Sequence, residues 1–333
     1  MIIENSKTYN VNDVENLFFR PSFCGKSAEE LGIRVLYNMP IPTSIPVFTH
    51  QNNILQEFSS GWHGGTTTTI DQKEIALSKL KAESSYSAES YFSTIYEMLT
   101  NSAEINLGDL SGTDLEKAET ELFRRGIVES IYSTMWFGDA EGELSDFTAF
   151  TGFIRRIIDA KEVTNSNTDI NIFPNVESMS SIRIFHTAWE YASSDLHMLS
   201  AEGNLAYFVS SDIYDAYQFY LDKKGLASNT EFLVNGRKGL YYHGIPIIEI
   251  PFKQSDVNRA QSFCILTDRR NLVLALNTAD SPEKEIRMWY NPDEMENRQR
   301  VVFLAGTAIV DDSLVSALIF DQGVDFIDGD IEE

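Results

Sequence analysis

Apolar residues repeat at helical spacing in the first half of the chain and predict one long helix over residues 114–136. Thr113 directly precedes this stretch, and Glu116 lies three residues after Thr113. This spacing fits a capping box at a helix start. The apolar positions form two neighbouring stripes along the helix: Leu115, Ala118, Leu122, Phe123, Ile127, Ile131 and Met135. At about 1.5 Å per residue, the helix would be about 35 Å long.

Shorter helical patterns follow, and then the periodicity changes to that of strands. Helices are predicted over 147–160, 181–200 and 212–224, and the first of them carries Arg155 and Arg156 on its polar side. From residue 232 onward, short apolar runs separated by glycine and proline predict strands over 232–234, 245–250, 262–267, 271–276, 285–290, 299–310 and 314–320. The pattern therefore predicts an α+β fold.

Residues 41–80 predict a long two-stranded loop. Three prolines favour extended backbone at its start, a glycine-rich turn signal covers 59–65, and β-branched residues fill 66–70. Each arm of about 18 residues could reach about 60 Å at about 3.3 Å per residue. Because an isolated hairpin is only marginally stable in water, we expect this loop to lie on a partner.

Two parts of the chain predict contacts with other subunits. Near the tip of the loop, the cluster Trp62–Gly65 could be a ligand-binding loop or an apolar anchor, and the anchor is favoured because an exposed tryptophan leaves a large apolar surface in water. Residues 1–35 cannot form a core alone, so we expect them to be an arm that docks onto another surface. These parts give the candidate inter-subunit contacts Phe58, Trp62, His63, Phe18 and Phe19. Arg155 and Arg156, on the polar side of the helix predicted over 147–160, are two further candidates.

Composition narrows the class of protein. The 333 residues are 43% hydrophobic, which suits a sizeable core in about two domains. No apolar run approaches the ~20 residues that span a bilayer, and the N-terminus lacks a signal-peptide pattern, so we expect the protein to remain in the cytoplasm that makes it. The net charge of −24 excludes a conventional nucleic-acid binder. It serves either general solubility or a surface that lies near packed DNA without adhering to it.

No pattern in the sequence predicts catalysis. It contains no phosphate-binding loop, no nucleophile elbow and no His-Glu-x-x-His motif. Its five histidines lack metal-ligand spacing, and Cys24 and Cys264 are expected to be free thiols. With 50 acidic residues, the presence of carboxylate pairs carries no information. We therefore expect no catalytic residue, no bound metal and no organic cofactor.

The order of these elements resembles that of the major capsid proteins of tailed bacteriophages, whose fold is named after the Hong Kong phage. The stretches that carry the resemblance are Tyr207–Ser210 with Ile213–Tyr217, Tyr242–Ile247, Ile265–Asp268 with Asn271–Val273, Glu285–Tyr290, and Val301–Gly306. The likeness covers nearly the whole chain. Shell-forming encapsulins share this fold, so the fold alone does not separate a virus from a compartment.

The resemblance implies a set of segments: an N-terminal arm (1–36), an extended β-hairpin loop (37–80), a peripheral domain (81–146 and 283–310) with a long spine helix, an axial α/β domain (147–282 and 311–321) and an acidic C-terminal tail (322–333). It implies self-assembly into pentamers and hexamers of an icosahedral virion shell around double-stranded DNA, built in the host cytoplasm. The implied partners are other copies, a scaffolding protein, a portal and decoration proteins, with neither sequence-specific DNA binding nor a membrane.

The sequence departs from the family in two places. No lysine lies between Lys26 and Lys73, so the covalent crosslinking of some family members is not expected. The arm begins at Met1 without a long helical segment before it, so we expect the arm to be retained and the scaffolding protein to be a separate chain. Two alternatives remain open: a soluble acidic, hydrolase-like enzyme, and a tail or baseplate structural protein.

Overall fold

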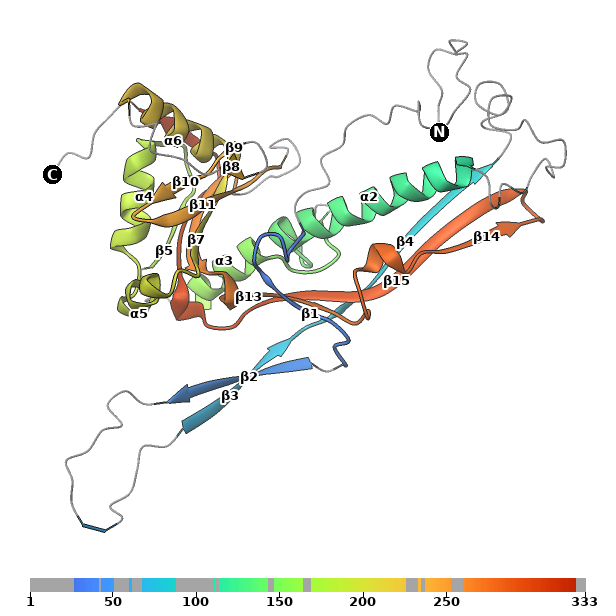
Figure 1. Cartoon of the computed structure of the whole chain (residues 1–333), viewed down its shortest axis with the longest axis horizontal. Coiled ribbons are helices and arrows are strands. Elements are labelled where there is room, and N and C mark those ends of the chain that lie inside the picture. The colour runs from blue at the N-terminus through green and yellow to red at the C-terminus, as the bar shows by residue number, and fades with distance from the viewer. Residues whose placement is uncertain are drawn as a thin grey trace.

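The computed structural model describes residues 27–41, 43–50, 60–61, 68–87, 109, 111, 114–142, 147–163, 169–225, 233–234, 237–252 and 260–327. These residues form an elongated body with a five-stranded sheet along one part and a six-stranded sheet at the other end (Figure 1). A long helix lies beside the first sheet, and shorter helices surround the second. The combination confirms the α+β class predicted from the sequence.

The five-stranded sheet is organised around one long strand, β15 (Glu296–Ile309). Strand β4 (Ser78–Ser87) pairs antiparallel with one edge of β15. The other edge pairs antiparallel with β14 (Arg287–Asn291) and then with β13 (Leu272–Leu276), and β13 pairs in parallel with β1 (Arg34–Leu36). The sheet therefore joins three distant parts of the chain, around residues 34–36, 78–87 and 272–309.

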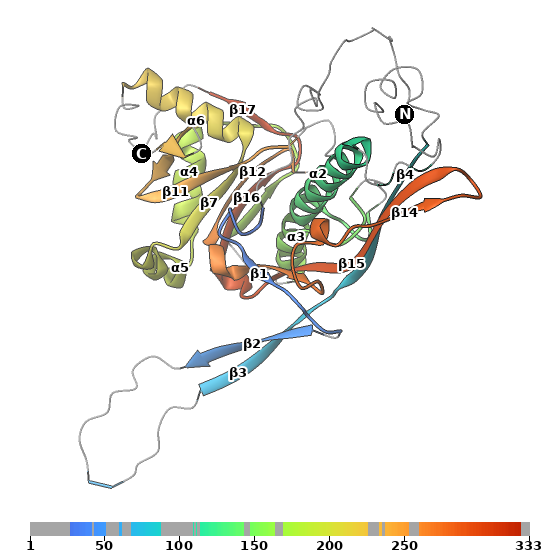
Figure 2. The same ribbon diagram turned by 45° about the vertical axis from the view of Figure 1, so that its right-hand side comes forward.

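Helix α2 (Asp114–Phe137) lies along one face of this sheet, as Figures 1 and 2 show, and confirms the helix predicted over 114–136. The contacts identify which face it covers. Gln299 Nε2 donates to the carbonyl oxygen of Glu119 at 3.5 Å, and Thr120 Oγ1 lies 3.0 Å from Met288 Sδ. Side chains alternate along strands, so the residues next to Gln299 and Met288 point to the opposite face.

The six-stranded sheet has the order β10 (Leu240–Tyr242), β11 (Ile245–Ile250), β7 (Leu205–Ser210), β12 (Ser262–Asp268), β16 (Val315–Phe320) and β5 (Ile170–Phe173). Every residue of β7, β12 and β16 is buried, so helices must cover both faces. Alternate residues of these strands point into two different cores. Each fully buried phenylalanine contributes about 1.5–3 kcal/mol to the stability of the fold.

The first core lies between this sheet, α2 and α3 (Phe153–Val163), and it includes Phe208, Phe263 and Trp136. The second core lies under α4 (Ser181–Glu190), α5 (Ser194–Leu199) and α6 (Ser211–Lys223). The small strands pair separately: β6 (Glu177–Met179) with β17 (Val324–Phe326), and β8 (Leu233–Val234) with β9 (Arg237–Lys238).

Two helix predictions differ from the structure. The helix predicted over 147–160 begins only at Phe153, because Gly152 N donates to the carbonyl oxygen of Gly138 at 2.7 Å in a tight contact that leaves no room for a helical turn or a side chain. The helix predicted over 181–200 is two helices. Ser193 starts the second, since its hydroxyl accepts from Leu196 N at 3.3 Å.

The sheets divide the chain differently from the segments implied by the resemblance. Strand β1 lies within the range 1–36 of the expected arm, yet it pairs with β13 and the neighbouring Leu31 and Ile33 are buried. Strand β13 lies within the range 147–282 of the expected axial domain, yet it belongs to the five-stranded sheet. Strand β4 starts at Ser78 rather than after residue 80. The remaining segment boundaries stay predictions.

Candidate inter-subunit surfaces

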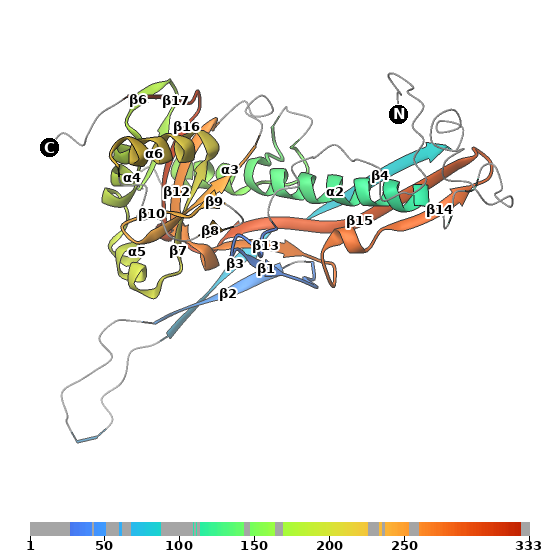
Figure 3. The same cartoon turned by 45° about the horizontal axis from the view of Figure 1, so that its top comes forward.

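A two-stranded hairpin projects from the body beneath the five-stranded sheet (Figures 1 and 3). Strands β2 (Thr43–His50) and β3 (Thr68–Ile75) pair antiparallel from Thr43 with Ile75 to His50 with Thr68. These two strands confirm the predicted two-stranded loop. Ile70 of β3 is 59% exposed, and Ile41, which precedes β2, is 65% exposed, so the hairpin and the segment leading into it present apolar surface that their own subunit leaves in water.

The base of the hairpin is fixed to the body. Ile45 and Ile75 are buried against Val273, Ala275 and Ala308 of the five-stranded sheet. Lys73 Nζ forms an ion pair with Asp312 Oδ2 at 3.0 Å. The direction of the hairpin is therefore set by the body, which suits a segment that must reach a particular place on a neighbour.

A close backbone approach lies just beyond the hairpin. Gly306 of β15 lies against Ala76 and Leu77, which connect β3 to β4, and a methyl group at Gly306 would overlap the carbonyl oxygen of Ala76. Glycine is therefore required there for β15 to pass the root of the hairpin.

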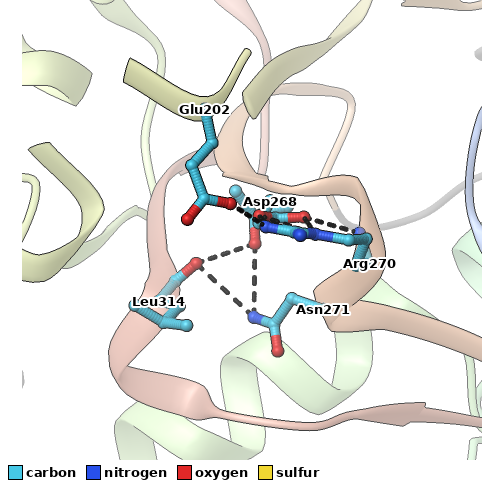
Figure 4. Close-up of polar contacts among 6 residues, drawn as sticks. Glu202, Asp268, Arg270, Asn271 and Leu314 are labelled. Carbon is cyan, nitrogen blue, oxygen red and sulfur yellow. Dashed lines mark hydrogen bonds and ion pairs between the residues drawn. The ribbon is translucent and has the colours of Figure 1, made fainter. Parts of the chain in front are cut away.

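A polar cluster joins the two sheets where the chain crosses between them (Figure 4). The short helix Arg269–Asn271 connects β12 to β13, and Asp268 caps it by accepting from Arg270 N at 2.8 Å. The carboxylate of Asp268 also accepts from Arg270 Nε at 3.0 Å and Nη2 at 2.6 Å. Glu202 accepts from Arg270 Nη2 at 2.7 Å.

The second crossing, from β15 to β16, is bound to the first through Asn271. Its side chain donates to the carbonyl oxygen of Asp311 at 2.9 Å and accepts from Asp311 N at 2.8 Å. Thr267 Oγ1 donates to the carbonyl oxygen of Leu314 at 2.7 Å. Together these contacts fix the two sheets relative to each other. Sequence reasoning missed the cluster, although the polar run Asp268–Asn271 between two apolar strands was its visible signal.

Burial alone would raise the pKa of Asp268, but the hydrogen bonds and charge of Arg270 outweigh it, so the pKa lies below its ordinary value of 3.8. A lowered carboxyl pKa contributes stability that is present above 3.8 and is lost as the pH falls through the folded-state pKa. We expect Asp268→Asn to reduce the free energy of unfolding by about 1–3 kcal/mol at pH 7 and by less at pH 3. Urea denaturation at both pH values measures this, and an equal loss at both would contradict it.

Arg155 and Arg156 both make contacts within their own subunit. Arg155 Nε lies 2.9 Å from Asp159 Oδ1, and its Nη1 lies 3.7 Å from Asp139 Oδ2. Arg156 Nε donates to Thr307 Oγ1 at 3.0 Å, and burial lowers the pKa of Arg156. Their predicted contact with another subunit stays a prediction. The other candidates, Phe58, Trp62, His63, Phe18 and Phe19, lie outside the described residues.

One open pocket of the described residues has a mostly apolar lining. This pocket of about 440 Å³ lies where α2 crosses β4 and β15, and Lys81 is the one ionisable group among its lining residues. No acidic residue lies among the lining residues, so this pocket contains no general acid–base pair. Nowhere among the described residues do three or more histidine, cysteine, aspartate or glutamate side chains gather as a metal site. No described helix has the length and apolar character needed to cross a bilayer.

The architecture is similar to that of several solved protein structures. No protein-family model and no curated protein matches the sequence. A solved chain from Gordonia phage Cozz matches with a TM-score of 0.54 at 11% identity, over 94% of this chain and 91% of that chain. A chain of the satellite phage P4 procapsid matches at 0.51 and 8%, over 87% and 93%.

The likeness extends to an encapsulin. The SrpI encapsulin complex from Synechococcus elongatus PCC 7942 contains a chain that matches with a TM-score of 0.52 at 10% identity, over 95% of this chain and 93% of that chain. At such low identities the likeness concerns the fold. The chain therefore has the fold shared by phage capsid and encapsulin shell proteins, which confirms the fold predicted from the sequence.

Proposed function

We propose that this protein is the major capsid protein of a tailed bacteriophage. The observation that carries the proposal is the capsid fold over nearly the whole length of the chain, with 94% of it covered in the match to the chain from Gordonia phage Cozz. In this proposal, copies assemble into pentamers and hexamers that form an icosahedral shell around double-stranded DNA. The role is structural, and the protein functions in the virion.

The geometry supports assembly in a specific way. The cluster at the two crossings makes the body rigid, and the projecting hairpin presents apolar residues that a neighbour can bury. Each such contact contributes about 25 cal/mol per Å² of apolar surface, and the contribution repeats around a closed shell. Individually weak contacts allow wrongly placed subunits to leave during growth.

The partners in this proposal are other copies of the chain, a separate scaffolding protein, a portal and decoration proteins. The net charge of −24 is compatible with DNA enclosed in the shell without specific binding. The fold comparisons do not favour a hydrolase-like enzyme or a tail protein. Assembly in the host cytoplasm belongs to the same proposal.

The match to the SrpI encapsulin supports a second candidate, a shell that encloses protein cargo. The contents of purified particles separate the two candidates. The capsid proposal expects nuclease-protected double-stranded DNA in filled particles, whereas an encapsulin-like compartment expects a co-purifying protein.

Negative-stain electron microscopy of the purified protein tests the proposed function. We expect closed shells of uniform size, either from the chain alone or after addition of its scaffolding protein. Tubes or rings would point to a tail protein, and a monomer under all conditions would contradict a shell role.

We also expect shells without covalent bonds between subunits. Lys73 is held in an ion pair at the base of the hairpin, and Lys79 and Lys81 lie in β4 of the five-stranded sheet rather than in the loop. Particles boiled in detergent without reductant should migrate as one band near 37.7 kDa. A ladder of dimers and larger species would contradict this prediction, and mapping the linked peptides would identify the reacting lysine.

A further inference from the structure

The face of the five-stranded sheet opposite α2 is called the open sheet face here, and it consists of outward residues of β4, β15 and β14. Because Met288 and Gln299 point toward α2, the next pairs in the register, Trp289 with Arg298 and Arg287 with Arg300, point away from it. The residues of β4 that pair with these outward residues of β15 lie on the same face of the sheet.

The open sheet face is rich in cations although the chain is strongly acidic. The chain has 26 basic and 50 acidic residues. The strands of this face present five of the basic residues: Lys79, Lys81, Arg287, Arg298 and Arg300. Only two carboxylates, Glu83 and Glu296, lie among them on the described strands, and the β14–β15 turn adds Glu294 beside Arg298.

Those carboxylates pair with only part of the positive charge. Glu83 lies 2.9 Å from Lys81 Nζ and 3.7 Å from Arg300 Nη1, and Glu296 lies 3.3 Å from Arg298 Nε. Within the part of the chain that the structure describes, Lys79 and Arg287 are exposed and no acidic side chain forms an ion pair with them. An excess of positive charge therefore faces solvent.

The same face contains exposed apolar surface. Trp289 is 41% exposed and Val302 is 46% exposed, and the guanidinium carbon of Arg300 lies 5.5 Å from the centre of the Trp289 ring. A tryptophan and arginines surrounded by further charges are the side chains that most often dominate protein–protein contacts. The combination fits a polypeptide partner better than a solvated surface.

We propose that the open sheet face binds the acidic surface of a second copy of this chain. This inference rests on the proposed shell function and names the contact that orients neighbouring subunits. The remainder of each copy carries more than the whole net charge of −24, so a second copy is electrostatically complementary to the face. Such complementarity accelerates the correct encounter and opposes others. The phosphate backbone of a nucleic acid would also be attracted to these cations, but the negative charge of the rest of the chain repels it.

Charge reversal tests the proposal. In the variant Lys79→Glu with Arg287→Glu, two exposed side chains change without removal of an ion pair that the structure shows. Arg183→Glu with Lys223→Glu is the matched control, because these residues are exposed on α4 and α6 and the net charge changes equally. We expect the first variant to assemble about tenfold or more slowly than the unmodified chain, and the control to assemble normally.

Carbodiimide crosslinking identifies the occupant directly. In particles assembled from equal amounts of ordinary and ¹⁵N-labelled subunits, we expect Lys79 or Lys81 linked to an aspartate or glutamate of the other isotope. Links confined to one isotope would overturn the proposal. Equal assembly of the two charge-reversal variants would also overturn it. A third contrary result would be a loss of DNA binding in the Lys79→Glu, Arg287→Glu variant without any link between copies. If the unmodified chain forms shells and the reversed variant forms them equally well, this inference fails while the proposed function stands.

Discussion

Replacing residues 51–67 by a short Gly-Ser linker is expected to give a folded, soluble subunit that forms no shells. The replaced stretch lies between β2 and β3, so both strands and the buried Ile45 and Ile75 at the base remain. We expect the free energy of unfolding to stay within about 0.5 kcal/mol of the unmodified value, because shortening a surface loop changes its closure entropy little. Denaturant titration measures the folding, and electron microscopy measures the assembly.

A length-matched Gly-Ser replacement of the same residues is the control for reach. It keeps the span of the loop and removes the side chains of Phe58, Trp62 and His63. If these residues anchor the loop on a neighbour, the length-matched variant also fails to assemble. Normal shells from the shortened variant would show that the loop does not hold subunits together.

Gly306→Ala is expected to destabilise the subunit by about 1–3 kcal/mol, as overpacking in a close contact does. The added methyl group overlaps the carbonyl oxygen of Ala76, so the root of the hairpin or β15 itself must shift. Because the hairpin direction depends on this contact, we also expect fewer closed shells. Denaturant unfolding of the isolated subunit gives the first effect, and particle counts give the second.

Gly126→Ala is the matched control in helix α2. Apart from the neighbouring backbone of its own helix, a methyl group at Gly126 meets nothing within 4 Å, and alanine is the better helix former. We expect this variant to be more stable by about 0.5–1 kcal/mol and to assemble normally. Similar behaviour of the two glycine variants would contradict the role given to the Gly306 contact.

The sequence predicted those elements whose formation depends on local patterns. The long helix and strand β11 (Ile245–Ile250) were located within one residue, because helical spacing, a capping box and flanking turn residues are local signals. Strand β5 (Ile170–Phe173) was missed, since four residues beside the end of a helix carry little periodicity. Its position is set by parallel pairing with β16, about 150 residues away along the chain.

The candidate surfaces were harder to predict than the single elements, because contacts between residues far apart in the sequence form them. The placement of β13 in the five-stranded sheet follows from its pairing with β15 and β1, which no local pattern encodes. The open sheet face combines residues of β4, β14 and β15 that lie far apart in the sequence. Its positive charge could not be predicted from the sequence, because the net charge of the whole chain is −24. Cys264, in contrast, was predicted as a free thiol and is free and buried.

A cryo-electron microscopy reconstruction of particles assembled from this chain tests the central claim most directly. The account predicts a closed icosahedral shell in which every position is occupied by this body, with the β2–β3 hairpin lying on an adjacent subunit. An ordered assembly without closed shells, or shells in which the hairpin contacts only its own subunit, would contradict it.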